Sequence, residues 1–147
     1  MANFMNKQNA DILNSVYRNA QMAYESTSDI IKRCKNNEFG RELTQQQRRY
    51  KTVASRARRE LARLGEPAKE ASPYVKSMAK MGIAVKTATN QSSSNLARIM
   101  LQGTTMGIID TQHTVNRSHA ARPAVRHSAE RLLEREQSFC EELKRYL

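Results

Sequence analysis

The sequence is poor in proline, glycine and cysteine, and each shortage excludes a class of protein. Three Pro and five Gly among 147 residues are too few for a collagen-like repeat or a disordered low-complexity chain. The two cysteines, Cys34 and Cys140, are too few for a disulfide framework or a zinc motif, and we interpret them as small buried residues in a reducing compartment. A chain of this length with 39% hydrophobic residues is expected to fold as one domain over residues 1–147.

Long apolar runs are also absent. The first eleven residues contain no continuous apolar stretch of the kind that directs secretion, so the expected location is the cytoplasm. The most apolar window, residues 96–109, is interrupted by Arg98, Gln102 and two glycines and is shorter than the roughly 20 residues that cross a bilayer. We therefore predict no membrane span.

Helical periodicity is the strongest signal that the sequence does contain. Apolar residues recur every three or four positions over residues 7–34 and 38–64, which predicts two amphipathic helices. Gly65 follows the last apolar position and Pro67 cannot continue a helix, so the second helix is expected to end there. Because only residues 35–37 link the two helices, we expect an antiparallel hairpin.

The rest of the chain predicts three further helices. Ser72 and Pro73 are a typical N-cap and first-turn proline for a short helix over residues 73–88. A long helix is expected over residues 93–118. Pro123 begins the last helix, whose apolar stripe runs to Leu147. No segment of alternating polarity predicts a strand, so the expected fold class is all α.

Four long amphipathic helices can bury their apolar stripes by forming a four-helix bundle. Residues 65–92 are more than a simple link requires, which favours a crossover that carries the short helix along the bundle over a plain up-down connection. The crossover places Cys34 and Cys140 toward the same end of the bundle, whereas the up-down chain places them at opposite ends. Their separation therefore tests the topology.

Two hairpins joined by such a crossover resemble the ferritin-like bundle. The run from Gln102 to Asp110 and the ending from Glu141 to Leu147 are similar to those of small bacterial bundle proteins of this kind, which share no agreed activity. The resemblance implies a fold, and it makes di-iron chemistry a possibility to be examined residue by residue.

The ligand set for di-iron chemistry is not present. A carboxylate-bridged site takes a Glu from each of two helices and a Glu-x-x-His motif from each of the other two, and no Glu-x-x-His occurs here. The nearest equivalent is Asp110 with His113. Glu136 falls within the last apolar stripe, but folding the last two helices about Ala120 leaves His113 roughly 13 Å away along the axis. Asp110, His113 and Glu136 are thus weak metal candidates, and we expect no metal, no cofactor and no enzymatic activity.

A structural role is the alternative for Glu136. A carboxylate on a buried face needs hydrogen-bond donors or becomes neutral. Tyr17, Tyr24, Tyr50 and Gln46 lie on stripes that face the same core, so we predict that they form a polar layer around this carboxylate. Such a layer is a hypothesis for how the register of the helices is fixed.

Gly103 and Gly107 are expected to share the inward face of the third long helix with Met106 and Asp110. A glycine inside a helix costs about 1 kcal/mol relative to alanine, so a pair at i and i+4 indicates that something needs the space. We expect a neighbouring helix or a tyrosine ring in this notch. The alternative is a small ligand cavity lined by Met100, Met106 and the tyrosines.

Positive charge is concentrated in the second helix. Residues 38–64 carry eight basic residues against three Glu, a net +5 out of the +11 of the whole chain. Helical geometry directs these residues away from the apolar stripe, onto one broad basic face. Such faces are usually just solvated; the alternatives are contact with nucleic-acid phosphates, with an anionic membrane surface or with an acidic protein. The basic residues are Arg41, Arg48, Arg49, Lys51, Arg56, Arg58, Arg59 and Arg63.

Two classes of function follow from these observations. The first is a noncatalytic helical bundle with an interaction or stress role, which could include association with further copies of the same chain as a homo-oligomer. The second is a basic protein that binds nucleic acid, or another acidic partner, without sequence specificity. The candidate nucleic-acid contacts are Arg48, Arg49, Arg56, Arg59 and Arg63. A metal or redox protein is a third and more remote class.

Overall fold

The computed structural model describes residues 2–147, most of which are helical. No strand occurs in this part of the chain, which confirms the predicted all-α class. Its elements are α1 (Ala2–Ile31), α2 (Asn37–Arg63), α3 (Pro73–Thr87), α4 (Ser93–Arg117), α5 (Pro123–Leu143) and the short 3₁₀ helix η1 (Lys144–Tyr146).

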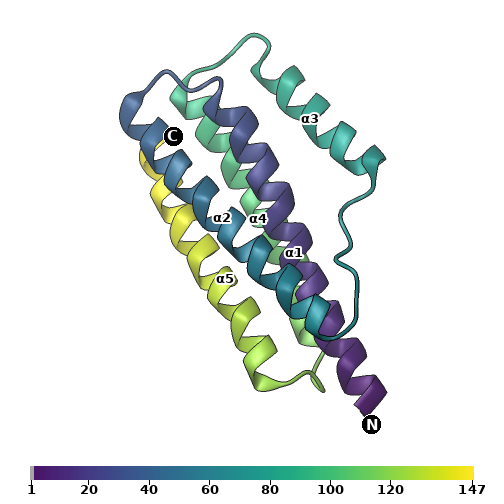
Figure 1. Ribbon diagram of the computed structural model, residues 1–147. Helices are drawn as coiled ribbons and strands as arrows, with labels where there is room; N and C mark the ends of the chain where they lie inside the picture. The colour runs from purple at the N-terminus through teal and green to yellow at the C-terminus, as the bar shows by residue number, and fades with distance from the viewer. Residues whose placement is uncertain (1) are drawn as a thin grey trace.

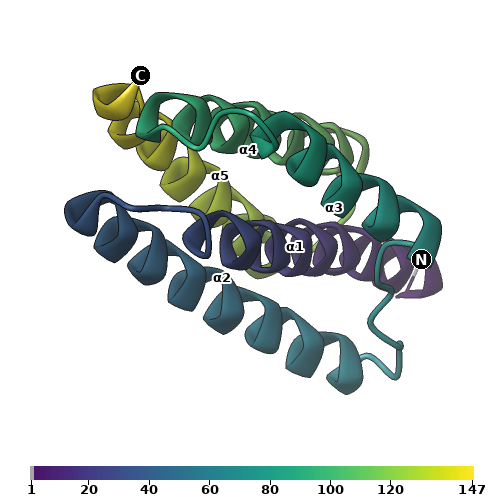
Figure 2. The same ribbon diagram turned by 90° about the horizontal axis from the view of Figure 1, so that it is seen from above.

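The four long helices lie side by side in two hairpins (Figure 1). α1 and α2 run antiparallel, and so do α4 and α5. Between the hairpins, the chain returns along the outside of the bundle through α3, so that α4 begins near the end at which α2 began. Figure 2 shows the bundle from above, with α3 on the side of α1 and α4 and away from α2.

The core consists of two apolar clusters, one toward each end of the bundle. The first joins the N-terminal half of α1 to the C-terminal half of α2 and the start of α5, with Leu13, Leu61 and Leu132 among its members. The second contains Phe39 and Phe139, and Cys34 packs against it. The stretches of α1, α2, α4 and α5 between the two clusters carry polar residues, which form the layer described below.

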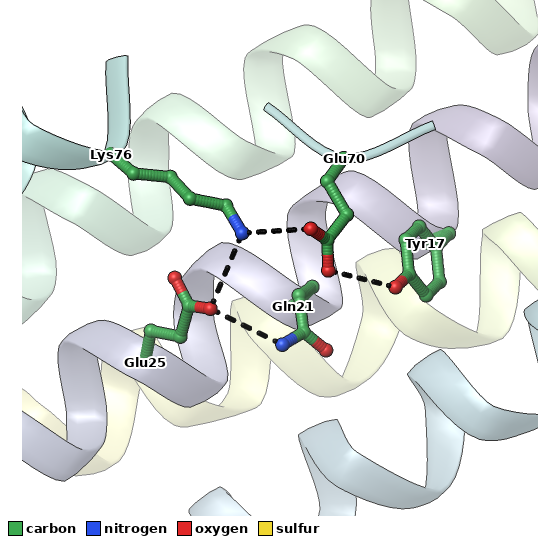
Figure 3. A network of polar contacts seen from close by, with 5 residues as sticks. All are labelled: Tyr17, Gln21, Glu25, Glu70 and Lys76. Atoms are coloured by element: carbon green, nitrogen blue, oxygen red, sulfur yellow. Dashed lines mark hydrogen bonds and ion pairs between the residues drawn. The ribbon is translucent and has the colours of Figure 1, made fainter. Parts of the chain in front are cut away.

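Residues 65–92, which we call the crossover segment, are attached to α1 by a network of polar contacts (Figure 3). The Tyr17 hydroxyl donates to Glu70 at 3.2 Å, and the Lys76 ammonium lies 3.0 Å from Glu70 and 3.5 Å from Glu25. The backbone N–H of Lys69 donates to the side-chain oxygen of Asn14 at 2.8 Å. These contacts hold the approach to α3 beside the middle of α1.

The ends of two helices differ from those that the periodicity predicts. α1 begins at Ala2 rather than near Lys7, so the mainly polar residues before the apolar stripe are also helical. It ends at Ile31, before the predicted end at residue 34. α5 ends at Leu143, after which the chain tightens into η1. The Tyr146 ring then stacks on Phe39 with ring centroids 4.1 Å apart, so the end of the chain covers the start of α2.

Candidate functional site

The basic face of α2 is exposed along the whole helix. Its apolar stripe, which includes Phe39, Leu43, Tyr50 and Leu61, is almost fully buried, and the charged positions therefore face outward. All eight predicted basic residues of α2 are exposed.

A groove of about 300 Å³ lies between α2 and α5, and arginines line both of its sides. We call it the arginine groove. Arg48, Arg49 and Arg56 come from α2, and Arg131 and Arg135 come from α5. Its apolar lining comes from Leu13, Val16, Val53, Ala57 and Leu132, and its other polar residues are Thr52, Glu60 and Ser128.

The groove includes only part of the predicted set of arginines. Arg59 and Arg63 do not line it, although both are exposed on α2. Sequence reasoning missed Arg131 and Arg135. Their signal is the i,i+4 spacing, which places them one turn apart on the same side of α5, but nothing in the sequence shows which helix that side faces.

The charge of the arginine groove is poorly compensated. Glu60 is the only acidic residue among those that line it. Over residues 2–147, none of its five arginines lies within ion-pair distance of a carboxylate. Like charges gathered in this way raise the local potential and attract anions, most strongly at low ionic strength.

A second groove of about 350 Å³ continues from the first toward Phe139. We call it the Gln46 groove. It shares Arg49, Arg131 and Arg135 with the arginine groove, and its remaining residues are Gln46, Glu134, Ser138, Phe139 and Glu142. Glu134 and Glu142 thus offset part of the positive charge in the Gln46 groove. The excess of positive charge is therefore larger in the arginine groove, where five arginines face one glutamate.

The polar layer surrounds Glu136, whose side chain is fully buried as predicted. Asn19 Nδ2 donates to one carboxylate oxygen at 2.7 Å, and the Tyr50 hydroxyl donates to the other at 3.0 Å. Asn19 Nδ2 also lies 3.2 Å from the carbonyl of Gly107 and 3.0 Å from the hydroxyl of Thr111. Four helices thus meet at one asparagine and one carboxylate.

Burial dominates the protonation of this layer. It raises the pKa of Glu136 from an ordinary value of 4.5 to about 7, against the opposing effect of the hydrogen bonds from Asn19 and Tyr50. Burial also raises the pKa of Tyr50, and the nearby charge of Glu136 adds to that rise. Tyr50 therefore remains a hydrogen-bond donor over the physiological range of pH.

The predicted partners of Glu136 were only partly right. Tyr50 does contact it, but Tyr17 turns to Glu70, and Tyr24 and Gln46 make no hydrogen bond with it. The donor that the sequence did not indicate is Asn19, a half-buried residue next to the apolar stripe of α1. A polar residue at such an edge position carries no signal of its own in the sequence.

The three weak metal candidates do not share one face. Glu136 is buried inside the bundle, whereas Asp110 and His113 are exposed on α4. Throughout residues 2–147, no group of three or more His, Cys, Asp or Glu side chains is arranged to hold a metal ion.

The expected inward face of α4 was wrong in part. Gly103, Met106 and Asp110 are exposed, and over residues 103–111 the buried positions are instead Thr104 and Thr111. A side chain at Gly103 would meet nothing within 4 Å, so no notch exists there. A Cβ at Gly107 would lie 2.5 Å from Asn19 Oδ1, so this glycine does make room, but for an asparagine amide rather than a tyrosine ring. Neither groove of the α2 and α5 face is lined by these two glycines.

Comparisons with known proteins add no relative. No family model, no curated protein and no solved structure matches the chain. Within residues 2–147, every helix falls short of the length and apolar character needed to cross a bilayer.

Proposed function

We propose that this protein is a noncatalytic helical bundle that binds nucleic acid through the arginine groove. The observation that carries the proposal is the set of five arginines, from two helices, that line one groove without ion-pair partners among residues 2–147. Each arginine that neutralises a backbone phosphate releases condensed counterions, which gives sequence-independent affinity. The guanidinium group also suits phosphate because it donates two parallel hydrogen bonds.

The lining of the groove favours contact with the phosphate backbone over contact with bases. Recognition of single strands commonly uses exposed aromatic rings on which the bases stack. The arginine groove contains no aromatic side chain, and Phe139 in the Gln46 groove is almost fully buried. A duplex, which presents its phosphates and keeps its bases stacked, is therefore the expected form of the ligand.

For the fold, we propose the ferritin-like order of helices, without the di-iron ligands. Its support is the course of the chain, in which α3 returns along the bundle between the two hairpins (Figure 1). The position of Cys34 against a cluster that includes Phe139 and Leu143, on either side of Cys140 in the sequence, agrees with a crossover.

The test is filter binding of duplex DNA and duplex RNA over a series of salt concentrations. If all five arginines contact phosphates, the logarithm of the affinity should fall with the logarithm of salt concentration with a slope of about −4 to −5. Undetectable binding at about 50 mM salt, where electrostatic binding is strong, would overturn the proposal.

A matched pair of variants separates the groove from net charge. The groove variant carries Arg49→Gln, Arg56→Gln and Arg131→Gln. The control carries Arg41→Gln, Lys51→Gln and Arg63→Gln, exposed positions on α2 that do not line the groove. Both lose three positive charges, but only the groove variant should lose most of its affinity and about three units of salt slope. Equal losses in the two would show that net charge alone attracts the ligand.

A further inference from the structure

Gln46 is a buried side chain with an unused hydrogen-bond donor. It is 1% exposed, and its Nε2 has no hydrogen-bond partner among the described residues. Its carbonyl oxygen accepts a long bond of 3.5 Å from Arg49 Nη1. Buried amide groups are nearly always paired, so this donor is available to an acceptor. The Nε2 atom is covered and lies near the Tyr50 hydroxyl, so the amide must rotate to reach an acceptor in the groove.

The groups around Gln46 specify the charge of that acceptor. Three arginines line both grooves and therefore lie where the grooves join, with Arg49 on α2 facing Arg131 and Arg135 on α5. None of the three has an ion-pair partner among residues 2–147. Guanidinium groups that two helices contribute to the same grooves suit an oxyanion with several oxygens, because each can donate two hydrogen bonds in a fixed geometry.

We infer that Gln46, Arg49, Arg131 and Arg135 form a seat for a single phosphate group at the junction of the two grooves. This inference rests on the proposed function and adds to it the position at which a backbone phosphate binds. Inorganic phosphate has the same chemistry, so the experiment below includes both sources.

Two carboxylates oppose anion binding from the far side of the seat. Glu134 and Glu142 line the Gln46 groove but not the arginine groove, and both are exposed. They restrict the phosphate to the side of the three arginines. Removing their charge should therefore strengthen phosphate binding, which is the opposite of the effect expected for the arginines.

The test is calorimetric titration of the full chain with inorganic phosphate in chloride buffer at constant ionic strength. Arg131→Gln with Arg135→Gln should weaken phosphate binding at least tenfold, because two charge-assisted donors are lost. Arg59→Gln with Arg63→Gln removes the same charge outside both grooves and should leave the affinity within about twofold. Glu134→Gln with Glu142→Gln should strengthen binding severalfold.

Gln46→Met separates the seat from a merely structural role. Methionine has a similar shape but lacks the amide, so the variant should bind phosphate more weakly. In the absence of phosphate, the same variant should unfold at a higher temperature, because a buried donor without a partner has been removed. Should this core variant fail to fold, the six exposed positions of the preceding test still decide the question.

Failure of the seat and failure of the proposed function give different results. Phosphate that does not bind at millimolar concentration, or binding that the arginine and Gln46 variants leave unchanged, overturns the seat even when duplex binds. Phosphate binding in the expected pattern without duplex binding supports the seat and overturns the nucleic-acid function. If both bind, phosphate should displace duplex at a concentration close to its own dissociation constant, and failure to compete would overturn the claim that a backbone phosphate occupies the seat.

Discussion

Asn19 of α1 donates a hydrogen bond of 2.7 Å to the buried carboxylate of Glu136 on α5, 117 residues away in the sequence. The same amide nitrogen reaches Gly107 and Thr111 on α4, and Tyr50 on α2 donates to the second carboxylate oxygen. One polar layer thereby connects all four long helices. The register of the bundle depends on this layer, since sliding any helix by one turn would separate a donor from its acceptor.

The stability of the protein should fall as the pH rises through the range in which the buried Glu136 loses its proton. Glu136 has a folded-state pKa of about 7, above the ordinary value of 4.5, so the native state holds a proton that the unfolded chain has released. The stabilisation is complete below pH 4.5 and is lost as the pH rises through about 7. The full change corresponds to about 3 kcal/mol. Urea unfolding between pH 4.5 and pH 8 measures it.

Glu136→Gln is the control for that pH dependence. Glutamine has the shape of the protonated acid and retains an oxygen that can accept from Asn19. The variant should match the wild type near pH 4.5 and exceed its stability at pH 8, where the wild type carries the cost of a buried charge. An unchanged pH profile would mean that Glu136 is not the responsible group.

Removing the amide of Asn19 should destabilise the bundle. Asn19→Leu leaves the Glu136 oxygen and the Thr111 hydroxyl without this donor, and we expect a loss of about 2–3 kcal/mol in the free energy of unfolding. The variant should also raise the pKa of Glu136 further, because one hydrogen bond that favours the charged form is lost. Asn116→Leu, at an exposed position on α4, is the control and should change stability by less than about 0.5 kcal/mol.

Gly103 and Gly107 provide a matched test of the space beside Asn19. Gly103→Ala should stabilise the protein by up to about 1 kcal/mol, because the new methyl group meets nothing and alanine favours the helix. Gly107→Ala should destabilise it, since a Cβ there would lie 2.5 Å from Asn19 Oδ1 and would displace an amide that is already hydrogen-bonded. Thermal unfolding compares the two, and the same sign for both would contradict this account.

Amide hydrogen exchange in the crossover segment should accelerate when its attachment to α1 is removed. Asn14→Ala removes the side-chain oxygen that accepts from the backbone N–H of Lys69, so that amide should exchange its hydrogen faster with solvent. Exchange within the middle of α2 should stay unchanged. Glu70→Gln should have a smaller effect, because Glu70 lies at the surface and its ion pair with Lys76 is worth less than about 1 kcal/mol.

Acid should weaken the same attachment. The hydrogen bond from Lys76 lowers the pKa of Glu70 below its ordinary value of 4.5, and the bond from Tyr17 lowers it further. A depressed pKa means that the contribution is present above pH 4.5 and is lost as the pH falls through the folded-state value. Hydrogen exchange over residues 66–76, measured at successively lower pH, should therefore accelerate before exchange in the bundle core does.

Much of the helix pattern could be predicted, because it is set locally. The start of α3 follows from Ser72 and Pro73, and the end of α2 from Gly65, whose φ of +73° is the left-handed conformation that glycine adopts readily. The burial of Glu136 was also predictable, since its position repeats with the apolar residues of α5. The inward face of α4 was harder to predict, because small and apolar residues surround much of that helix and Thr104 and Thr111 are no more hydrophobic than their exposed neighbours.

The sequence by itself determined the all-α class, the limits of most helices and the concentration of positive charge on α2, because propensity, capping and periodicity act within a few residues. Only the tertiary structure decided that Asn19 meets Glu136 and that Arg131 and Arg135 complete a groove begun by the arginines of α2. Such meetings depend on how each helix is rotated about its axis and how far it is shifted along its neighbour. Packing of all the helices together sets both quantities, and no single helix encodes them.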